Sequence, residues 1–159
     1  PKKPWALNGC KGRNPNSIQS LFLTPGVLEA HNWKLEKKYE KMEKKEVRFE
    51  SYYCDGCDFL LISYGTCARI AKEAVMKARS EGIKIGLFRP VSLWPFPYRA
   101  LSEHIKRTKK VLVVEMSLGQ MLDDVKIAAC SSQTRIFFYG RPGGGVPDPD
   151  EIYREIKKK

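Results

Sequence analysis

The protein has 159 residues, of which 42% are hydrophobic and 30% charged, as is typical of a single globular domain. This composition excludes a disordered or fibrous chain, and the longest mainly apolar run, Phe59–Tyr64, is far shorter than the roughly 20 residues of a membrane span. Five scattered cysteines and no export leader favour a reducing, cytoplasmic setting. The chain starts with Pro1 rather than Met, which suggests a fragment or a processed chain.

The net charge of +11 raises the question of a nucleic-acid partner. However, the basic residues form no single stripe in the sequence, and lysines and glutamates alternate between residues 28 and 46 as on a solvated helix face. We therefore expect no nucleic-acid and no membrane partner. The alternative is a basic module that binds anions or nucleic acid, with an affinity that falls steeply with salt.

Residues 1–46 are expected to form an interdomain arm and a linker helix. Proline and glycine are frequent in residues 1–27, which show no hydrophobic period and are expected to be extended. Residues 28–46 predict a helix with a thin apolar stripe, which packs weakly on its own domain. We therefore expect this arm, with Trp5 and Trp33, to pack on another domain or subunit.

Residues 47–159 alternate between strand and helix patterns. An alternating strand is expected at Val47–Tyr53, followed by four short apolar strands at Phe59–Tyr64, Ile83–Phe88, Val111–Val114 and Ile136–Tyr139. Helices are expected at Cys67–Ser80, Tyr98–Thr108, Met121–Ala129 and Asp150–Lys158. This rhythm is typical of a three-layer α/β domain with a parallel sheet buried on both faces. The turn signal Asp55-Gly56, taken alone, would pair the first two strands as a hairpin.

Candidate ligand or interface positions follow three of these strands, because ligands of open parallel sheets bind beyond the carboxyl ends of the strands. They are Gly65, Thr66, Glu115, Gln120, Arg141, Gly143 and Gly144. The glycines after Arg141 would let a backbone approach a phosphate or a neighbouring polypeptide closely. For Gly65 and Thr66, the plainer interpretation is a tight turn between strand and helix that Thr66 caps. A regulatory domain that binds a small molecule at these strand ends is a further alternative.

Cys54 and Cys57 form a C-x-x-C motif around the Asp-Gly turn. A zinc site would need further ligands, for which Cys10 and Cys67 are the available thiols, and a redox pair usually lies at a helix N-terminus rather than before a strand. We predict that neither Cys54 nor Cys57 binds metal.

Four stretches are distinctive in combination: Tyr64–Ile70 (YGTCARI), Gly82–Pro97 (GIKIGLFRPVSLWPFP), Glu115–Val125 (EMSLGQMLDDV) and Tyr139–Gly144 (YGRPGG). Together they resemble the C-terminal part of the alpha subunit of a 2-oxoacid:ferredoxin oxidoreductase, most of all the 2-ketoisovalerate (3-methyl-2-oxobutanoate) type. The resemblance implies that residues 47–159 form a transketolase C-terminal-like domain. Its fold would be three-layer α/β/α with a five-stranded, mostly parallel sheet, in which the first strand runs antiparallel and away from the hairpin position.

Enzymes of this family oxidatively decarboxylate a 2-oxoacid on thiamine diphosphate and Mg²⁺, pass electrons through iron–sulfur clusters to ferredoxin, and form acyl-CoA from coenzyme A. The family's Gly-Asp-Gly motif and any ferredoxin-type cysteine run are absent from this sequence. The resemblance therefore implies a structural and interface domain of a multi-subunit oxidoreductase, inactive alone and binding no cofactor itself. Its partners would be the other domains and subunits, and ferredoxin through the complex.

Overall fold

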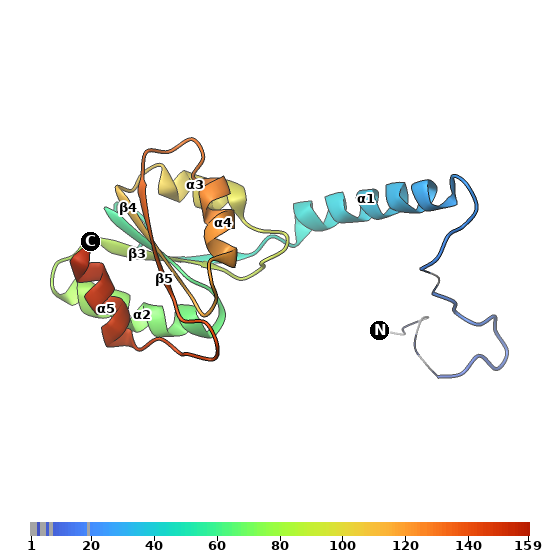
Figure 1. Ribbon diagram of the computed structural model, residues 1–159, viewed down its shortest axis with the longest axis horizontal. Coiled ribbons are helices and arrows are strands. Elements are labelled where there is room, and N and C mark those ends of the chain that lie inside the picture. Colours follow the sequence, from blue (N-terminus) through green and yellow to red (C-terminus); the bar gives the residue numbers. More distant parts are fainter. Residues whose placement is uncertain (1–2, 4–5, 7, 19) are drawn as a thin grey trace. The chain divides into compact units, whose positions relative to one another are not determined.

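The computed structural model describes residues 3, 6, 8–18 and 20–159, so the predicted contact of Trp5 lies outside the described residues. The chain divides into two compact units, Pro1–Lys41 and Met42–Lys159. Figure 1 shows the elements in chain order. Among the described residues, no helix has both the length and the apolar character needed to cross a bilayer.

The predicted charged helix is confirmed as α1, which begins at Val27 and ends at Lys45. It buries none of its residues, and Trp33 is 62% exposed. Apolar side chains of the preceding segment are also open to solvent, with Ile18 and Leu23 more than four-fifths exposed. The helix thus contributes no buried residue to a core, as the narrow apolar stripe predicts.

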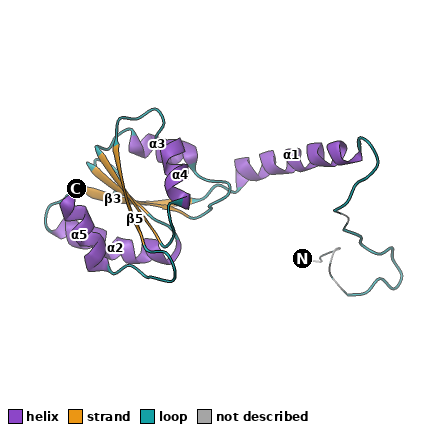
Figure 2. Cartoon of the chain, viewed as in Figure 1, coloured by secondary structure: helices purple, strands orange, loops and turns teal. Residues whose placement is uncertain are grey.

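The second unit holds a five-stranded sheet with the order β1-β3-β2-β4-β5. Its strands are β1 (Phe49–Tyr52), β2 (Phe59–Ile62), β3 (Ile85–Pro90), β4 (Lys110–Glu115) and β5 (Arg135–Gly140). β1 runs antiparallel to β3, and the other neighbours are parallel. The mostly parallel sheet with an antiparallel first strand is confirmed. The hairpin of the first two strands is wrong, because β2 pairs with β3 and β4 on its two sides and leaves no edge for β1. Figure 2 shows the strands gathered in one sheet between the helices.

Helices cover both faces of this sheet and make the three layers (Figure 1). They are α2 (Gly65–Ser80), α3 (Tyr98–Ile105), α4 (Gln120–Ala128) and α5 (Pro149–Lys158). Successive residues of β2 point to opposite faces, so Leu61 packs with α2 and α5 while Leu60 packs with α3 and α4. All four residues of β2 are buried, which explains its continuous apolar sequence.

The turn after α2 shifts the start of the next strand. Gly82 has φ +85°, the Gly82 N–H donates to the Arg79 carbonyl at 2.9 Å, and the Ile83 N–H donates to the Ala78 carbonyl at 3.1 Å. This pair of bonds is a Schellman cap, in which the left-handed residue is usually glycine. Because Ile83 completes that cap, β3 begins at Ile85 rather than at Ile83. Likewise, α3 ends at Ile105 rather than at Thr108, whose hydroxyl donates to the Ile105 carbonyl at 3.0 Å.

Candidate functional site

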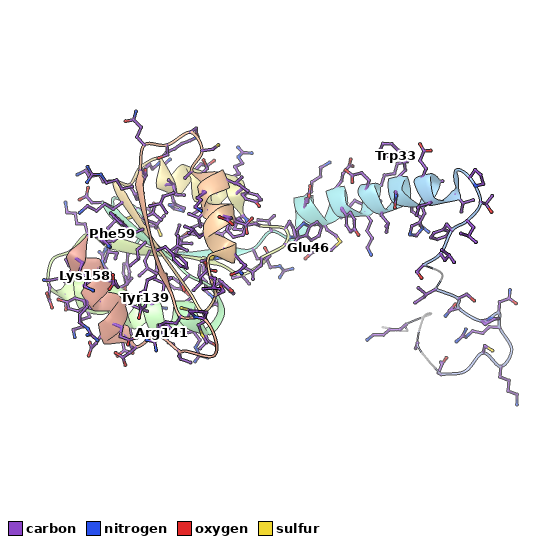
Figure 3. The ribbon with its side chains drawn as sticks, in the orientation of Figure 1. Trp33, Glu46, Phe59, Tyr139, Arg141 and Lys158 are labelled. Atoms are coloured by element: carbon purple, nitrogen blue, oxygen red, sulfur yellow. The ribbon has the colours of Figure 1, made fainter. Side chains whose placement is uncertain are left out.

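The seven candidate residues follow β2, β4 and β5, which are neighbours in the sheet and run in the same direction. Their carboxyl ends therefore meet at one edge of the sheet, which is the edge where Arg141 is labelled in Figure 3. The Arg141 N–H donates to the Glu115 carbonyl at 3.0 Å, so the loops after β4 and β5 touch through their backbones. The structure brings these loops together, as the strand pattern predicts.

Glu115 is fully buried and is already used inside the chain. Its carboxylate accepts from the Ser117 hydroxyl at 2.6 Å, from the Met121 N–H at 3.1 Å and from the Leu122 N–H at 3.4 Å. The last two donors belong to the first turn of α4, whose N–H groups have no partner within the helix. Glu115 is therefore the side chain that caps α4 from the preceding strand, and it has no surface to offer a ligand.

Gln120 is exposed at the start of α4, and its side-chain oxygen accepts from the Leu118 N–H at 2.9 Å. This bond closes the short loop between β4 and α4, in which Gly119 has φ +111°. The left-handed conformation at Gly119 explains why a glycine stands there. Gln120 thus shapes the loop through its side-chain oxygen.

The predicted helix cap by Thr66 is wrong. α2 begins at Gly65, two residues before the predicted start at Cys67. Its N-cap is Tyr64, and no side chain makes a hydrogen bond at that end. Gly65 has φ +57°, and a Cβ atom there would meet nothing within 4 Å. A glycine is therefore favoured here because of the positive φ, and not because another described part of the chain approaches its Cα closely. Gly65 and Thr66 are exposed at the N-terminus of α2.

Arg141 is tied to α5. Its Nη1 donates to Glu151 Oε2 at 2.7 Å and lies 3.5 Å from the Tyr139 hydroxyl, and these contacts raise the pKa of Arg141. Glu151 also accepts from the Asp148 N–H within a capping box, which is the main reason that the pKa of Glu151 is lowered. The Arg141 side chain is 38% exposed, so part of it remains open to solvent.

Gly143 and Gly144 are exposed and have φ +70° and +84°. A Cβ atom at either position would meet nothing within 4 Å. No described part of this chain therefore approaches the two glycines closely, although the sequence suggested such an approach. Their positive φ values show that they form a left-handed turn. Four of the seven candidates, Gly65, Thr66, Gly143 and Gly144, consequently remain as an open surface along the edge.

Cys54 and Cys57 both lie in the core beside Leu60. The Cys54 thiol donates to the Leu87 carbonyl at 3.3 Å. Burial raises the pKa of Cys54 to about 12 and also raises the pKa of Cys57. Metals and oxidants react with the thiolate, which is disfavoured here. Among the described residues, no three His, Cys, Asp or Glu side chains are grouped so as to hold a metal ion.

We expect the native protein to be alkylated at Cys10 and Cys130, which are exposed, and to be protected at Cys54, Cys57 and Cys67, which are buried. Iodoacetamide labelling at mildly alkaline pH, read by peptide mass spectrometry, measures this, with the unfolded chain as the control in which all five thiols react. Labelling of Cys54 as fast as that of Cys130, or one equivalent of bound zinc in elemental analysis, would contradict the assignment of a buried, metal-free pair.

A second polar cluster, which no sequence pattern indicates, lies at this edge near the end of β3. A cavity of about 460 Å³ is lined by Tyr52, Ala68, Arg69, Lys72 and Arg89. Glu50 Oε2 accepts from the Tyr52 hydroxyl at 2.6 Å and from Arg89 Nη1 at 2.9 Å, and the pKa of Glu50 is lowered, mainly by the Tyr52 bond. The cluster depends on the register that pairs Glu50 with Arg89, which no local pattern reveals.

A family model, pyruvate:ferredoxin oxidoreductase core domain II, matches residues 57–152. The ketoisovalerate oxidoreductase subunit VorB of Methanothermobacter marburgensis is 37% identical over 158 residues, which cover 99% of this chain and 44% of that subunit. The 2-oxoglutarate synthase subunit KorA of the same organism is 38% identical over 112 residues, which cover 70% of this chain and 30% of that subunit. The chain therefore spans less than half the length of these curated relatives.

Two solved structures share the fold. The 2-oxoglutarate:ferredoxin oxidoreductase from Magnetococcus marinus aligns with a TM-score of 0.69 at 22% identity, over 91% of this chain and 24% of that chain. An inactive split-gene transketolase tetramer aligns with a TM-score of 0.58 at 18% identity, over 70% of this chain and 40% of that chain. The sheet is thus the transketolase-like one that the resemblance implies. Because the family model covers more than half of the sequence, the protein belongs to the pyruvate:ferredoxin oxidoreductase core domain II family.

Proposed function

We propose that the protein is the C-terminal part of the alpha subunit of a 2-oxoacid:ferredoxin oxidoreductase. The complete enzyme would convert a branched-chain 2-oxoacid and coenzyme A to acyl-CoA and CO₂, with ferredoxin as the electron acceptor in the cytoplasm. The observation that carries the proposal is the alignment with a ketoisovalerate oxidoreductase subunit, which runs over 99% of the chain and so includes the arm. The alignment with the 2-oxoglutarate synthase subunit covers only 70% of the chain.

The residues of this chain do not fit the cofactors of such an enzyme. Thiamine diphosphate is held through Mg²⁺ by oxygen ligands, and the described residues group no three acids, cysteines or histidines that could hold a metal. Iron–sulfur clusters need several thiolates brought together, and the described cysteines form no such group. We therefore assign thiamine diphosphate, Mg²⁺ and the clusters to the rest of the enzyme. We also expect coenzyme A to be bound there, and assign no chemical step to this domain.

The role that remains is a structural and interface one. Two surfaces support it: the open glycine loops at the carboxyl edge, and the arm, whose apolar side chains are exposed. Exposed aromatic and aliphatic groups of this size are typical of surfaces that another polypeptide covers. The proposed partners are the other domains and subunits of the oxidoreductase.

Arg141→Glu in the complete enzyme is expected to reduce the amount of assembled complex, because it reverses a charge beside the open glycine loop. The substitution also sets a carboxylate against Glu151, so a local cause must be separated from an interfacial one. Lys77→Glu is the matched control, because it reverses a charge and sets a carboxylate against Asp150, which Lys77 contacts at 2.6 Å. We expect Arg141→Glu to reduce the assembly measured by size-exclusion chromatography more than Lys77→Glu does. An equal loss of assembly in both variants would contradict an interface at Arg141.

A further inference from the structure

The basic residues that are scattered in the sequence gather at one edge of the folded domain, which differs from the even spread that the sequence suggests. The edge is the one at which β2, β3, β4 and β5 begin, opposite the candidate site. Helices α2, α3, α4 and α5 also end there, because each runs back from the carboxyl ends of the strands. In Figure 3, Phe59 and Lys158 mark this edge and Arg141 marks the opposite one.

Backbone hydrogen bonds hold the strand starts in one row. The Asp58 N–H donates to the Lys84 carbonyl at 2.9 Å, and the Lys109 N–H donates to the Asp58 carbonyl at 3.0 Å. The Arg135 N–H in turn donates to the Lys109 carbonyl at 3.2 Å. Adjacent strands lie about 4.8 Å apart, so the charged side chains before β3, β4 and β5 stand within a short distance of one another.

We define the amino-end face as residues 53–58, 79–84, 106–110, 129–135 and 157–159, all of which the structure describes. The face carries ten cations and three acids, a net charge of +7. Residues 42–159 as a whole carry +6, so the rest of this unit is close to neutral at −1. The fold therefore gathers the positive charge of this unit on one face, although the charged residues are spread along the sequence.

Helix termini explain only part of this excess. Cations near the C-terminus of a helix are favoured by the helix dipole, which accounts for residues such as Arg79 and Lys157. Lys84 and Lys109 immediately precede strands and Arg135 is the first residue of β5, where no such dipole acts. Lys84, Lys106, Arg107 and Arg135 are exposed and form none of the ion pairs found among the described residues. Their mutual repulsion is an electrostatic cost that an anionic partner would remove.

We propose that the amino-end face docks an acidic polypeptide segment, a partner that the proposed enzymatic function does not require. The face is poor in the features that nucleic acids need. Tyr53 is the one aromatic residue of these segments, and the Arg79 guanidinium lies over its ring at 4.4 Å. The face thus offers no row of aromatic rings on which successive bases could stack.

The acids of the face also favour a polypeptide. Asp58 is paired with Lys109 at 2.9 Å and Glu81 with Lys157 at 3.1 Å, so carboxylates alternate with cations across the surface. A continuous phosphate backbone would be repelled at those points, whereas a polypeptide can place its glutamates opposite the unpaired cations. Recognition by exposed charges acts mainly on the association rate and weakens with salt.

The test is to titrate the complete chain with an oligoglutamate peptide and with a DNA duplex of the same total charge, by fluorescence anisotropy at low and at physiological salt. The variant of interest is Lys84→Glu/Arg107→Glu/Arg135→Glu. Its matched control is Lys34→Glu/Lys37→Glu/Lys41→Glu, which changes the net charge by the same amount on exposed positions of α1. Far-ultraviolet circular dichroism and the melting temperature establish that each variant is folded, and the corresponding glutamine variants replace any that is not.

We expect the peptide to bind more tightly than the duplex. In the variant of the face, the affinity for the peptide should fall about tenfold, because three exposed ion pairs with the peptide would be lost. The control should lose less than about threefold in affinity, because its charges lie in the other unit. An equal loss in both variants would show attraction by net charge alone and would overturn the proposal. Tighter binding of the duplex, lost in the same variant, would overturn it in favour of nucleic acid.

Discussion

Replacing Glu115 with leucine is expected to lower the free energy of unfolding by about 3 kcal/mol. Leucine fills a similar volume but accepts no hydrogen bond, so the Ser117 hydroxyl and the Met121 and Leu122 N–H groups would lose their acceptor. The carboxylate is also an anion at the N-terminus of α4, where the helix dipole favours it. Both losses occur at a fully buried site, where water cannot replace the missing acceptor.

Denaturant unfolding followed by circular dichroism measures this effect. Glu115→Gln keeps one acceptor oxygen and is expected to cost less than the leucine variant. Glu103→Leu is the matched control, because Glu103 is 60% exposed and makes one long ion pair with Arg99, so its loss should cost less than about 0.5 kcal/mol. If the Glu115 and Glu103 variants were equally stable, the capping role of Glu115 would be refuted.

Gly86→Ala is expected to cost about 3 kcal/mol, for a steric reason. A Cβ atom at Gly86 would lie 2.8 Å from Cys54 Cα and 2.8 Å from the Tyr53 carbonyl oxygen. Both atoms belong to the backbone that leaves β1, so neither can turn aside as a flexible side chain could. β3 is buried at this point, and the alanine could be accommodated only by moving β1 away from the sheet.

Gly143→Ala is the matched control for this substitution. Gly143 has φ +70° but no neighbour within 4 Å, so alanine meets only the strain of the left-handed conformation, about 1 kcal/mol. The same unfolding experiment compares the two variants. A larger loss of stability at Gly143 than at Gly86 would contradict the close crossing of the chain over β3.

The strands were predictable where burial alone fixes their sequence. β2 and the middle of β4, residues 111–114, are covered by helices on both faces, so these residues are apolar without interruption and stand out in a single sequence. The position of β1 could not be predicted in this way. Its exposure alternates, the nearby Asp55-Gly56 turn indicates a hairpin, and only the resemblance to a family placed it in antiparallel pairing elsewhere in the sheet.

The location of the candidate site was predictable, whereas the orientation of its side chains was not. Strand ends in a parallel sheet share one edge, so the loops at Gly65, Gln120 and Arg141 were expected to lie together. The sequence does not show where a side chain points. Glu115 turns inward to bond Met121, six residues on, and Arg141 turns toward Glu151, ten residues on, because the loops between these partners fold back over the strand ends.

The charge distribution follows the same principle. Cations that are far apart in the sequence reach one edge because each parallel strand begins, and each helix ends, at that edge. A linear count of charges cannot show this gathering, and the net value of +11 alone suggests only a general attraction to anions.

The most direct test of the proposed function is to purify, through a tag on this protein, the complex that it forms, and to assay it with coenzyme A and ferredoxin. We predict that the complex turns over 2-oxoacids and that its kcat/KM for 3-methyl-2-oxobutanoate exceeds that for 2-oxoglutarate. The tagged chain alone should give no turnover under the same conditions. A complex without 2-oxoacid oxidation, a preference for 2-oxoglutarate, or turnover by the chain alone that survives rigorous purification would contradict the account.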